Sequence, residues 1–300
     1  MSSFAFLVQL CEYRPLAHAM LSTPLQTGLT VTPEETSESS VVLGEFAAFD
    51  GNPDFVLSLA RGLKVIESFE GRTNGQTVAD VARATNLSRA AVRRSLMTLE
   101  MLGYVESSGR TYRLRTRVLR LGFSYLASNS LPAMAQPTLE RITELIHESS
   151  SLCVMDGEQI VYVARSVAKR VMSVGLSIGS RLPAYCTSMG RVLLAARTDA
   201  ELARYLDRVE IKALTSKTIT DKQLLSEIIR RIRWDGFTVA DEELELGLRS
   251  IAVPVKNHQG NVVAAMNIGV HAARVSSAEL VHRFLPILQE HAALLGPLLR

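Results

Sequence analysis

The sequence has few of the residues and motifs from which enzymatic and metal sites are usually built. Its three cysteines, Cys11, Cys153 and Cys186, lie far apart, and no pair has the spacing of metal ligands. The six histidines do not cluster, and GxxxxGK[ST], HExxH and GxSxG are absent. An odd number of cysteines argues against a disulfide framework and favours a reducing cytoplasm. We therefore expect no metal, no cofactor and a cytoplasmic location.

Long apolar runs are also missing, because Arg, Asp, Glu or Gly interrupts each of the longer ones. The first ten residues are mildly apolar but lack a basic start and a small-residue cleavage site, so we expect no signal peptide. Hydrophobic residues make up 47% of the 300 and charged residues 21%, as in ordinary globular proteins. This length favours two domains over one.

Charge is unevenly distributed along the chain. Residues 1–54 carry one basic and seven acidic side chains, a net charge of −6, whereas residues 55–120 carry twelve basic and five acidic ones, a net charge of +7. The whole-chain value of +3 hides this contrast. A compact basic module is typical of proteins that bind a polyanion such as DNA. On charge alone, a solvated basic surface is an equal alternative.

The N-terminal part predicts an extension followed by a helix. Residues 1–53 have no sustained period and include a stretch rich in Ser, Thr, Pro and Glu, so we expect a disordered extension. From Phe55 to Phe69 apolar residues recur at helical spacing, which predicts a first helix that ends near Gly71.

Residues 77–114 predict a winged helix-turn-helix. Thr77 and Ser88 are each placed to cap a helix, and Asp80 stands in the capping-box position after Thr77. Asn86 and Leu87 supply the turn between the two helices. The apolar face of the second helix consists of Val92, Leu96 and Leu99. Tyr104–Leu114 then predicts two strands joined by a turn at the SSG of residues 107–109.

The opposite face of the second helix has the residue types that DNA recognition requires. Arg93 and Arg94 offer bidentate donors to guanine, and the small Ala90 lets the helix approach a groove. Arg89 and the Ser88 hydroxyl suit a phosphate. The predicted DNA-binding residues are Ser88, Arg89, Ala90, Arg93, Arg94, Met97, Arg110 and Arg113, the last two in the wing. An ordinary helical hairpin with a charged outer face is the alternative interpretation.

Residues 115–130 predict a linker helix, basic and then apolar, in which Val118, Leu121 and Tyr125 are placed to pack on a partner copy. Pro132 predicts a break before an amphipathic helix over 134–148. Short β-type runs then alternate with helices: SLCVMDG, QIVYVARSV, RVMSVG, FTVADEE, RSIAVPVKN and VVAAMNIGV, with helices from about Ser188, at 199–206, 221–233 and 276–298. Hairpin strands with helices on one side predict an α+β domain over 131–300, an antiparallel sheet with a pocket.

Three motifs resemble a known family: SLARGLKVIESF, GSRLPAYCTSMGRVLLA and DEELELGLRSIAVPV. Together they resemble the IclR family of bacterial transcription regulators, from about Asp54 to the C-terminus. The second and third are most similar to the subgroup that regulates protocatechuate and 4-hydroxybenzoate catabolism through the β-ketoadipate pathway. The resemblance implies a GAF-like effector domain that binds a small carboxylic acid. It also implies a homodimer or dimer of dimers on double-stranded DNA with a palindromic operator.

The resemblance further implies that the effector lies between the sheet and the loop–helix motif. Carried over position by position, the effector-binding residues are Val171, Val174, Leu182, Ser188, Met189, Leu248, Ser250, Asn267 and Gly269. Ser188 and Met189 open a helix, where free N–H groups favour a carboxylate. Ser250 and Asn267 lie on strands, where alternation can direct both inward. The alternatives are that Ser188 is only an N-cap and Ser250 only a tolerated core residue.

Several arginines are candidate partners for the acid. Arg165, Arg170 and Arg181 all fall within the β-rich region, and the sequence does not rank them. Arg249 follows Glu245 and Gly247, and we expect it to form a structural ion pair.

Two other classes of function are alternatives to a regulator. The residue types of a catalytic triad are present in Ser188, Cys186, His271 and Asp241. However, no nucleophile elbow surrounds the serine and the order matches no known triad, which disfavours a hydrolase of such acids. An architectural DNA-binding protein would need no C-terminal domain of this size. The prediction is a regulator, not an enzyme, controlled by an aromatic or dicarboxylic acid, with activation and repression both open.

Overall fold

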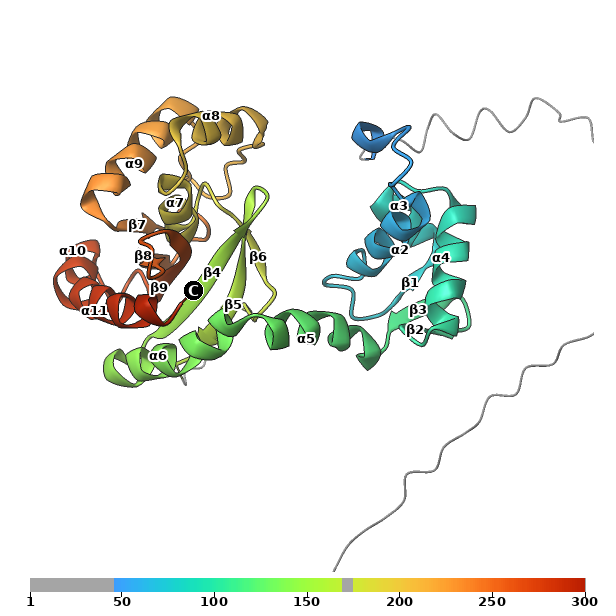
Figure 1. The fold of residues 1–300 in the computed structure, drawn as a ribbon, viewed down its shortest axis with the longest axis horizontal. Helices are drawn as coiled ribbons and strands as arrows, with labels where there is room; N and C mark the ends of the chain where they lie inside the picture. Colours follow the sequence, from blue (N-terminus) through green and yellow to red (C-terminus); the bar gives the residue numbers. More distant parts are fainter. Residues whose placement is uncertain (1–45, 169–174, 300) are drawn as a thin grey trace, which may run out of the picture. The chain divides into compact units, whose positions relative to one another are not determined.

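The computed structural model describes residues 46–168 and 175–299. The chain divides between Arg115 and Thr116 into two compact units (Figure 1). The β-type run RVMSVG, apart from its final glycine, and the candidates Arg170, Val171 and Val174 lie outside the described residues, as does most of the expected extension. A search of the described helices found none with the length and apolar character needed to cross a bilayer.

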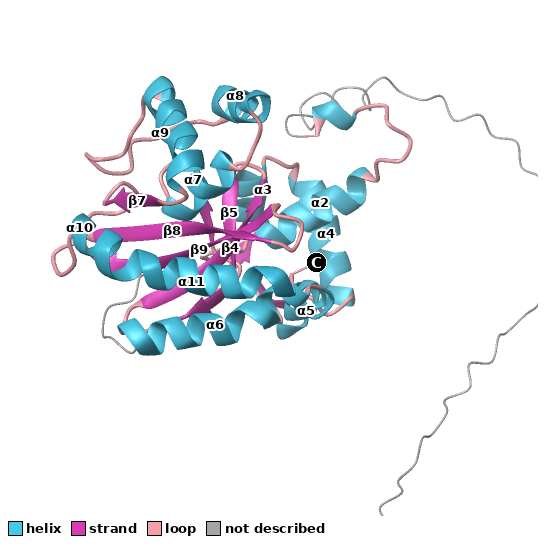
Figure 2. Ribbon diagram, turned by 60° about the vertical axis from the view of Figure 1, so that its left-hand side comes forward, coloured by secondary structure: helices cyan, strands magenta, loops and turns pink. Residues whose placement is uncertain are grey.

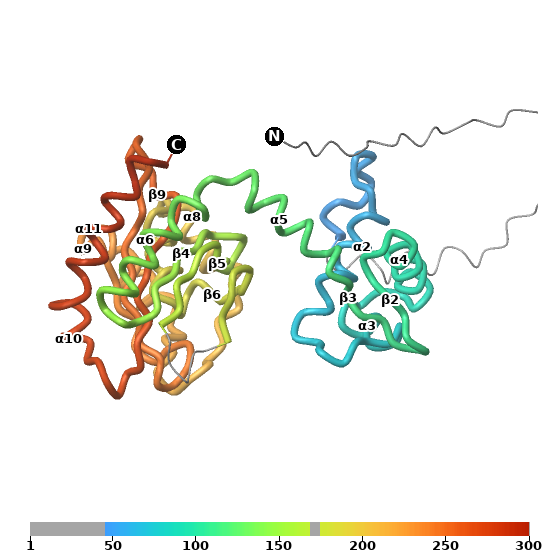
Figure 3. The backbone as a smooth tube through the Cα atoms, turned by 90° about the horizontal axis from the view of Figure 1, so that it is seen from below, coloured from blue at the N-terminus to red at the C-terminus, as the bar shows by residue number. Residues whose placement is uncertain are grey.

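The first unit packs three helices against a small antiparallel sheet. Its elements are α2 (Leu57–Glu67), β1 (Gln76–Thr77), α3 (Val78–Thr85), α4 (Arg89–Met101), β2 (Val105–Ser108) and β3 (Thr111–Leu114). The strand order is β1-β3-β2, and Figure 3 shows α4 beside the β2–β3 hairpin. Val65, Val81, Val92 and Leu96 form the centre of the core and are fully buried. These elements make a winged helix-turn-helix, in which only the short β1 was not expected.

The helix starts of this unit follow from their capping residues. The Thr77 hydroxyl accepts a hydrogen bond from Asp80 N, and the Asp80 carboxylate accepts one from Thr77 N, at 3.2 and 3.1 Å, completing a capping box. Hydrogen bonds from the Thr77 hydroxyl and then from its backbone N–H hold the pKa of Asp80 below its usual value. Ser88 Oγ accepts from Ala91 N at 3.2 Å and caps α4.

Two details of this unit differ from the expectation. Residues before Asp54 already contact the unit, since Phe49 stacks on Phe55 with ring centroids 4.7 Å apart. The turn of the wing consists of Gly109 and Arg110 rather than SSG, since Ser108 pairs with Thr111 in the ladder. Gly109 has a φ of +64°, a left-handed conformation that glycine adopts without strain.

The second unit is built on a six-stranded sheet in which every neighbouring pair is antiparallel, in the order β6-β5-β4-β9-β8-β7. Its strands are β4 (Ser149–Asp156), β5 (Gln159–Ser166), β6 (Arg181–Pro183), β7 (Thr238–Asp241), β8 (Leu248–Lys256) and β9 (Val262–His271). Its helices are α5 (Leu119–Ser128), α6 (Ser130–Ile146), α7 (Ser188–Ala195), α8 (Asp199–Arg208), α9 (Lys222–Asp235), α10 (Ser277–Glu279) and α11 (Leu285–Leu295). A π-helical turn, Leu280–Phe284, joins α10 to α11, so the closing helix is not a single α-helix.

Helices cover both faces of this sheet, whereas the sequence pattern predicted one covered face. On one face α6 and α11 lie side by side (Figure 2), and a core that includes Leu139, Met266 and Leu288 fills the space beneath them. On the other face α7 packs on the strands, with Ala252 and Ala265 among the buried contacts. Both faces of the central strands carry buried apolar side chains, so each face requires a cover.

The predicted break at Pro132 is wrong. The linker helix α5 ends at Ser128, and α6 begins at Ser130, two residues before the proline. Asn129 Oδ1 accepts a hydrogen bond from Leu131 N at 3.0 Å and caps this start. Pro132 thus falls in the first helical turn, where its missing N–H would have had no helical acceptor.

Candidate functional site: the DNA-binding face and the effector cavity

The eight predicted DNA-binding residues are all exposed. On α4 the buried face includes Val92 and Leu96, and the opposite face presents Arg93, Arg94 and the 46% exposed Met97. Among the described residues no carboxylate forms an ion pair with either arginine, so both side chains are available to an anion. Figure 1 shows α4 on the periphery of its unit. This arrangement has the form of a recognition helix.

The wing adds two more basic side chains. Arg110 occupies the two-residue turn between β2 and β3, and Arg113 lies on β3. Arg113 packs along Gly75, where an added Cβ would lie 2.9 Å from Arg113 Cγ. A glycine at this position therefore leaves room for the arginine stem. Both side chains are exposed.

The second unit contains a cavity of about 470 Å³ on the α7 side of its sheet. Its floor is two rows of side chains that lie in register across neighbouring strands, which places them on one face. The first row is Arg165 on β5, Ser151 on β4 and Asn267 on β9. The second row is Ser149 on β4, Gly269 on β9 and Ser250 on β8. Polar groups thus line a pocket of the size that holds small ligands.

Gly269 keeps the centre of this floor open. A Cβ built on Gly269 would meet no atom within 4 Å, so the glycine faces open space rather than packed protein. Its two neighbours in the row, Ser149 and Ser250, have short side chains. The volume of the cavity therefore depends on small residues in the second row.

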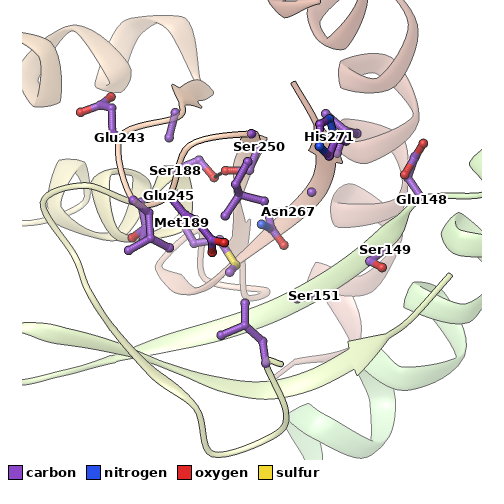
Figure 4. A pocket seen from close by; sticks show the side chains of 18 of the residues that line it. Glu148, Ser149, Ser151, Ser188, Met189, Glu243, Glu245, Ser250, Asn267 and His271 are labelled. Atoms are coloured by element: carbon purple, nitrogen blue, oxygen red, sulfur yellow. Dashed lines mark hydrogen bonds between the residues drawn. The ribbon is translucent and has the colours of Figure 1, made fainter. Parts of the chain in front are cut away.

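The start of α7 forms part of the roof. Thr187 is the N-cap residue of α7, with its hydroxyl accepting from Gly190 N at 3.2 Å. Ser188 is therefore not the cap. Its hydroxyl instead shares a hydrogen bond of 2.8 Å with Ser250 across the cavity, and Figure 4 shows the two side chains pointing toward each other. Met189, also at this helix start, lines the cavity as well.

The rest of the roof is the loop between β7 and β8, residues 242–247. Glu243 of this loop forms a buried bidentate ion pair with Arg191 of α7, at 2.5 and 2.6 Å. At the other end, Gly247 N donates to Glu242 Oε2 at 2.9 Å. Hydrogen bonds from the Lys217 ammonium and then from Gly247 N lower the pKa of Glu242. The loop is therefore fastened to α7 and closed on itself over the cavity.

Six of the nine predicted effector-binding residues line this cavity: Ser188, Met189, Leu248, Ser250, Asn267 and Gly269. Leu182 does not line it and packs against the core beneath α7. Several lining residues were not predicted. Ser149 and Ser151 lie on the same face of β4, but the residue between them, Ser150, is also a serine, so the sequence has no alternation that would have distinguished them. The ion pair of Glu148 with Arg274, 3.2 Å, has no local signal in the sequence either.

The structure ranks the candidate arginines. Arg165 lines the cavity, with its guanidinium carbon 5.9 Å from the centroid of the Tyr162 ring, and burial lowers its pKa. Arg181 lies outside the cavity and pairs with Asp156 at 2.7 Å. Arg249 pairs with Asp241 at 2.7 Å, which confirms the predicted structural ion pair.

The residues considered for catalysis are not assembled into a triad. Ser188 bonds to Ser250, and Asp241 is held by Arg249. Burial raises the pKa of the Cys186 thiol to about 12, so the nucleophilic thiolate is absent near neutral pH. Within the described ranges, His, Cys, Asp and Glu side chains also form no group of three that would hold a metal ion.

Comparisons with known families match both units of the chain. The description "IclR helix-turn-helix domain" matches residues 58–109, and "Bacterial transcriptional regulator IclR C-terminal" matches residues 123–295. The chain belongs to the IclR family. It is therefore a DNA-binding transcriptional regulator rather than an enzyme, as the resemblance of its motifs predicted.

Relatives of this IclR-family regulator include the Pca regulon regulatory protein of Pseudomonas putida, 51% identical over 80% of this chain and 83% of the relative. A crystal structure of a putative transcriptional regulator from Rhodococcus sp. RHA1 is 50% identical, with a TM-score of 0.71, covering 81% of this chain and 97% of that one. The inducer-binding domain of a PobR double mutant from Acinetobacter, complexed with 3-hydroxybenzoic acid, is 35% identical, with a TM-score of 0.55. It covers 56% of this chain and 99% of that domain.

Proposed function

We propose that this regulator controls genes of aromatic-acid catabolism, in particular of the protocatechuate and β-ketoadipate pathway, in response to a small carboxylic acid. The observation that carries the proposal is the cavity of about 470 Å³. The Pca regulon relative and the 3-hydroxybenzoic acid complex of the PobR domain support the class of ligand. Because it acts on DNA, we place its function in the cytoplasm.

The effector site comprises the six predicted residues that line the cavity. Ser188 and Ser250 supply hydroxyls from the roof and the floor, and Asn267 supplies an amide. Met189 and Leu248 supply apolar surface, and Gly269 supplies space. A small acid with an apolar body needs this mixture of a few polar groups on an apolar wall.

The output site is the exposed face of α4 with the wing. Arg93 and Arg94 contact base edges in the major groove, Arg89 and Ser88 contact phosphate at the helix start, and Arg110 contacts phosphate from the wing. The remaining members of this set are Ala90, Met97 and Arg113.

The working form is a homodimer on a palindromic site. The linker helix α5 exposes apolar side chains, among them Leu119 at 72% and Phe123 at 68% of their surface. A contiguous apolar patch of this kind on a helix is typical of an interface. Two copies of α4 then enter successive major grooves of the operator, and the acid biases one arrangement of the dimer.

A two-part binding experiment tests this function. Operator sequences are first selected from random duplex DNA with the full chain, and mobility shift is then measured with and without protocatechuate, 4-hydroxybenzoate and adipate. The proposal expects a palindromic selected site and an affinity that at least one acid changes. Selection of no sequence, or an affinity that is indifferent to all of these acids, would contradict it.

A further inference from the structure

Two buried polar atoms on the cavity floor have no hydrogen-bond partner among the described residues: Arg165 Nε and Asn267 Oδ1. Both residues line the cavity, and they occupy the two ends of the same row, with Ser151 between them. Buried polar groups in folded proteins are nearly always hydrogen-bonded, because an unpaired one has lost its water without compensation. A ligand bound in the cavity can therefore supply partners for these two atoms.

At the Arg165 end, the missing partner is an anion. Arg165 forms no ion pair with the described residues, and its nearest aromatic neighbour, Tyr162, stays protonated because burial raises its pKa. Among the described residues, the other arginine that lines the cavity, Arg274, is paired with Glu148. The planar donor fork of a guanidinium matches the two oxygens of a carboxylate. Arg165 is thus the unpaired cation for the acid group of a ligand.

At the Asn267 end, the missing partner is a hydrogen-bond donor. Asn267 is 7% exposed, and its Oδ1 requires a hydrogen-bond donor. A carboxylate has only acceptors at neutral pH, so a second carboxylate would leave Oδ1 facing a negative charge. A hydroxyl can donate to Oδ1 and also accept from Nδ2. Arg165 and Asn267 lie two strand spacings apart in the same row, so about 10 Å separates their Cα atoms. Because both side chains reach inward, a small rigid acid can span the distance that remains between them.

Building on the effector function proposed above, we infer that the cavity binds a hydroxylated aromatic acid in a fixed orientation. Its carboxylate lies on the Arg165 guanidinium, its ring hydroxyl lies on the Asn267 amide, and its ring lies over the open floor beside Gly269. Arg165 and Asn267 are the specificity-determining residues, and they select a hydroxy acid over a dicarboxylate of similar length.

The test pairs each residue with one group of the ligand. Calorimetry on the full chain uses 4-hydroxybenzoate, 4-hydroxybenzamide, 4-methylbenzoate and adipate as probes. The benzamide removes the charge, and the methyl compound removes the hydroxyl, with little change of shape. The wild type should bind 4-hydroxybenzoate roughly ten- to a hundredfold more tightly than either isostere, the factor expected for a hydrogen bond to a charged or buried group.

The variants assign each preference to a residue. In Arg165→Met the preference for carboxylate over carboxamide should disappear while the preference for hydroxyl over methyl persists. In Asn267→Leu the opposite should hold. Arg181→Met is the matched control, because Arg181 lies on the same sheet outside the cavity and should leave both preferences unchanged. Arg165→Lys keeps the charge but loses the fork, and should weaken the carboxylate preference only in part.

The outcomes separate the two proposals. If the wild type binds none of the four probes, the effector function fails and this inference fails with it. If the wild type binds the acids but prefers adipate, or if both isostere preferences survive in Arg165→Met and Asn267→Leu, only this inference is overturned. The preferences for carboxylate over carboxamide and for hydroxyl over methyl are measured in the wild type as well. The proposed ligand class can therefore be refuted even if one of the variants does not fold.

Discussion

Arg191 and Glu243 form a bidentate ion pair inside the second unit, with Nη1 2.6 Å from Oε1 and Nη2 2.5 Å from Oε2. Their side chains are 2% and 8% exposed. Arg191 Nε also donates to Tyr185 O at 2.8 Å. One arginine thus ties α7 to the loop before it and to the loop 242–247, and these segments make the roof of the cavity. The shape of the effector site depends on this pair.

Removing one member of the pair should be far more costly than removing both. Arg191→Met leaves the Glu243 carboxylate buried without its partner, and we expect a loss of roughly 3–5 kcal/mol in the free energy of unfolding. The double variant Arg191→Met/Glu243→Gln removes the uncompensated charge and should lose clearly less. Urea denaturation followed by circular dichroism measures both. A single variant as stable as the wild type would show that the pair does not hold the roof.

Ser250→Ala should weaken the response to the effector and leave operator affinity without effector intact. The hydroxyl lies in the cavity and bonds to Ser188, so its loss removes about 1 kcal/mol of ligand binding. Calorimetry with the acid and mobility shift with the operator separate the two effects. Ser216→Ala, on an exposed loop, is the control. Loss of operator binding in the absence of effector would rule out a role confined to the cavity.

An added side chain should abolish acid binding at Gly269 and reduce stability at Gly190. Gly269→Val places its methyl groups in the open cavity, so the protein should remain as stable as the wild type while acid binding is lost. Gly190→Ala places Cβ 2.3 Å from Ala184 O in the packed start of α7, and should cost about 2–3 kcal/mol or more of stability. Thermal unfolding and calorimetry test both. If Gly269→Val still binds the acid at wild-type affinity, the ligand does not occupy this floor.

The basic residues of the first unit should divide into base and phosphate contacts. Arg94→Ala should cost roughly 1–3 kcal/mol on the selected operator and relax the base preference at one position. Arg113→Ala should instead weaken binding to all DNA sequences alike. It should also reduce by about 1 the slope of the logarithm of the binding constant against the logarithm of salt concentration. Arg231→Ala, an exposed arginine of the second unit, is the control. Uniform weakening by Arg94→Ala would identify Arg94 as a phosphate contact.

Stability should fall at alkaline pH because of buried acids that stay protonated in the folded state. Burial raises the pKa of Cys186 from 9.0 to about 12 and also raises those of Cys153 and Tyr205. The unfolded chain therefore loses these protons at lower pH than the folded one. The stability they contribute is complete below pH 9.0 and is lost as the pH rises toward 12.

Thermal denaturation between pH 8 and 11 measures how steeply stability falls with pH, and Cys186→Ala should make this fall shallower. At pH 8 a thiol reagent should label Cys153 and Cys186 no faster than the protein unfolds, because the reactive thiolate is not present in the folded protein. Rapid labelling of both thiols in the folded state would contradict their burial.

The helix α4 and its exposed face were predictable because their signals are local. The period of Val92, Leu96 and Leu99, together with the cap at Ser88, defines both the ends of α4 and its outward side. The predicted break at Pro132 failed because a proline is tolerated in the first turn of a helix, and the N-cap residue Asn129 was not recognised as the start of α6. Local rules therefore located the helix but not its first residue.

The effector cavity was only partly predictable because it depends on strand pairing. Ser151 and Asn267 are more than a hundred residues apart in sequence, and only the antiparallel pairing of β4 with β9 places them side by side. The same pairing explains why Arg165 was not ranked above Arg181. Both are arginines on strands, and only the register shows that Arg165 shares a row with Asn267. The family motifs supplied the residues that the local pattern did not.

We propose that a hydroxylated acid bound in the second unit controls operator binding by the first. The most direct measurement is the dissociation constant of the full chain for its selected operator, titrated at fixed salt with saturating 4-hydroxybenzoate or protocatechuate and without it. We predict a change of about 5- to 150-fold, the usual range of allosteric coupling, and an equal change in acid affinity when operator is bound. Tight binding of the acid with identical operator affinity in both conditions would rule out control of operator binding by the acid.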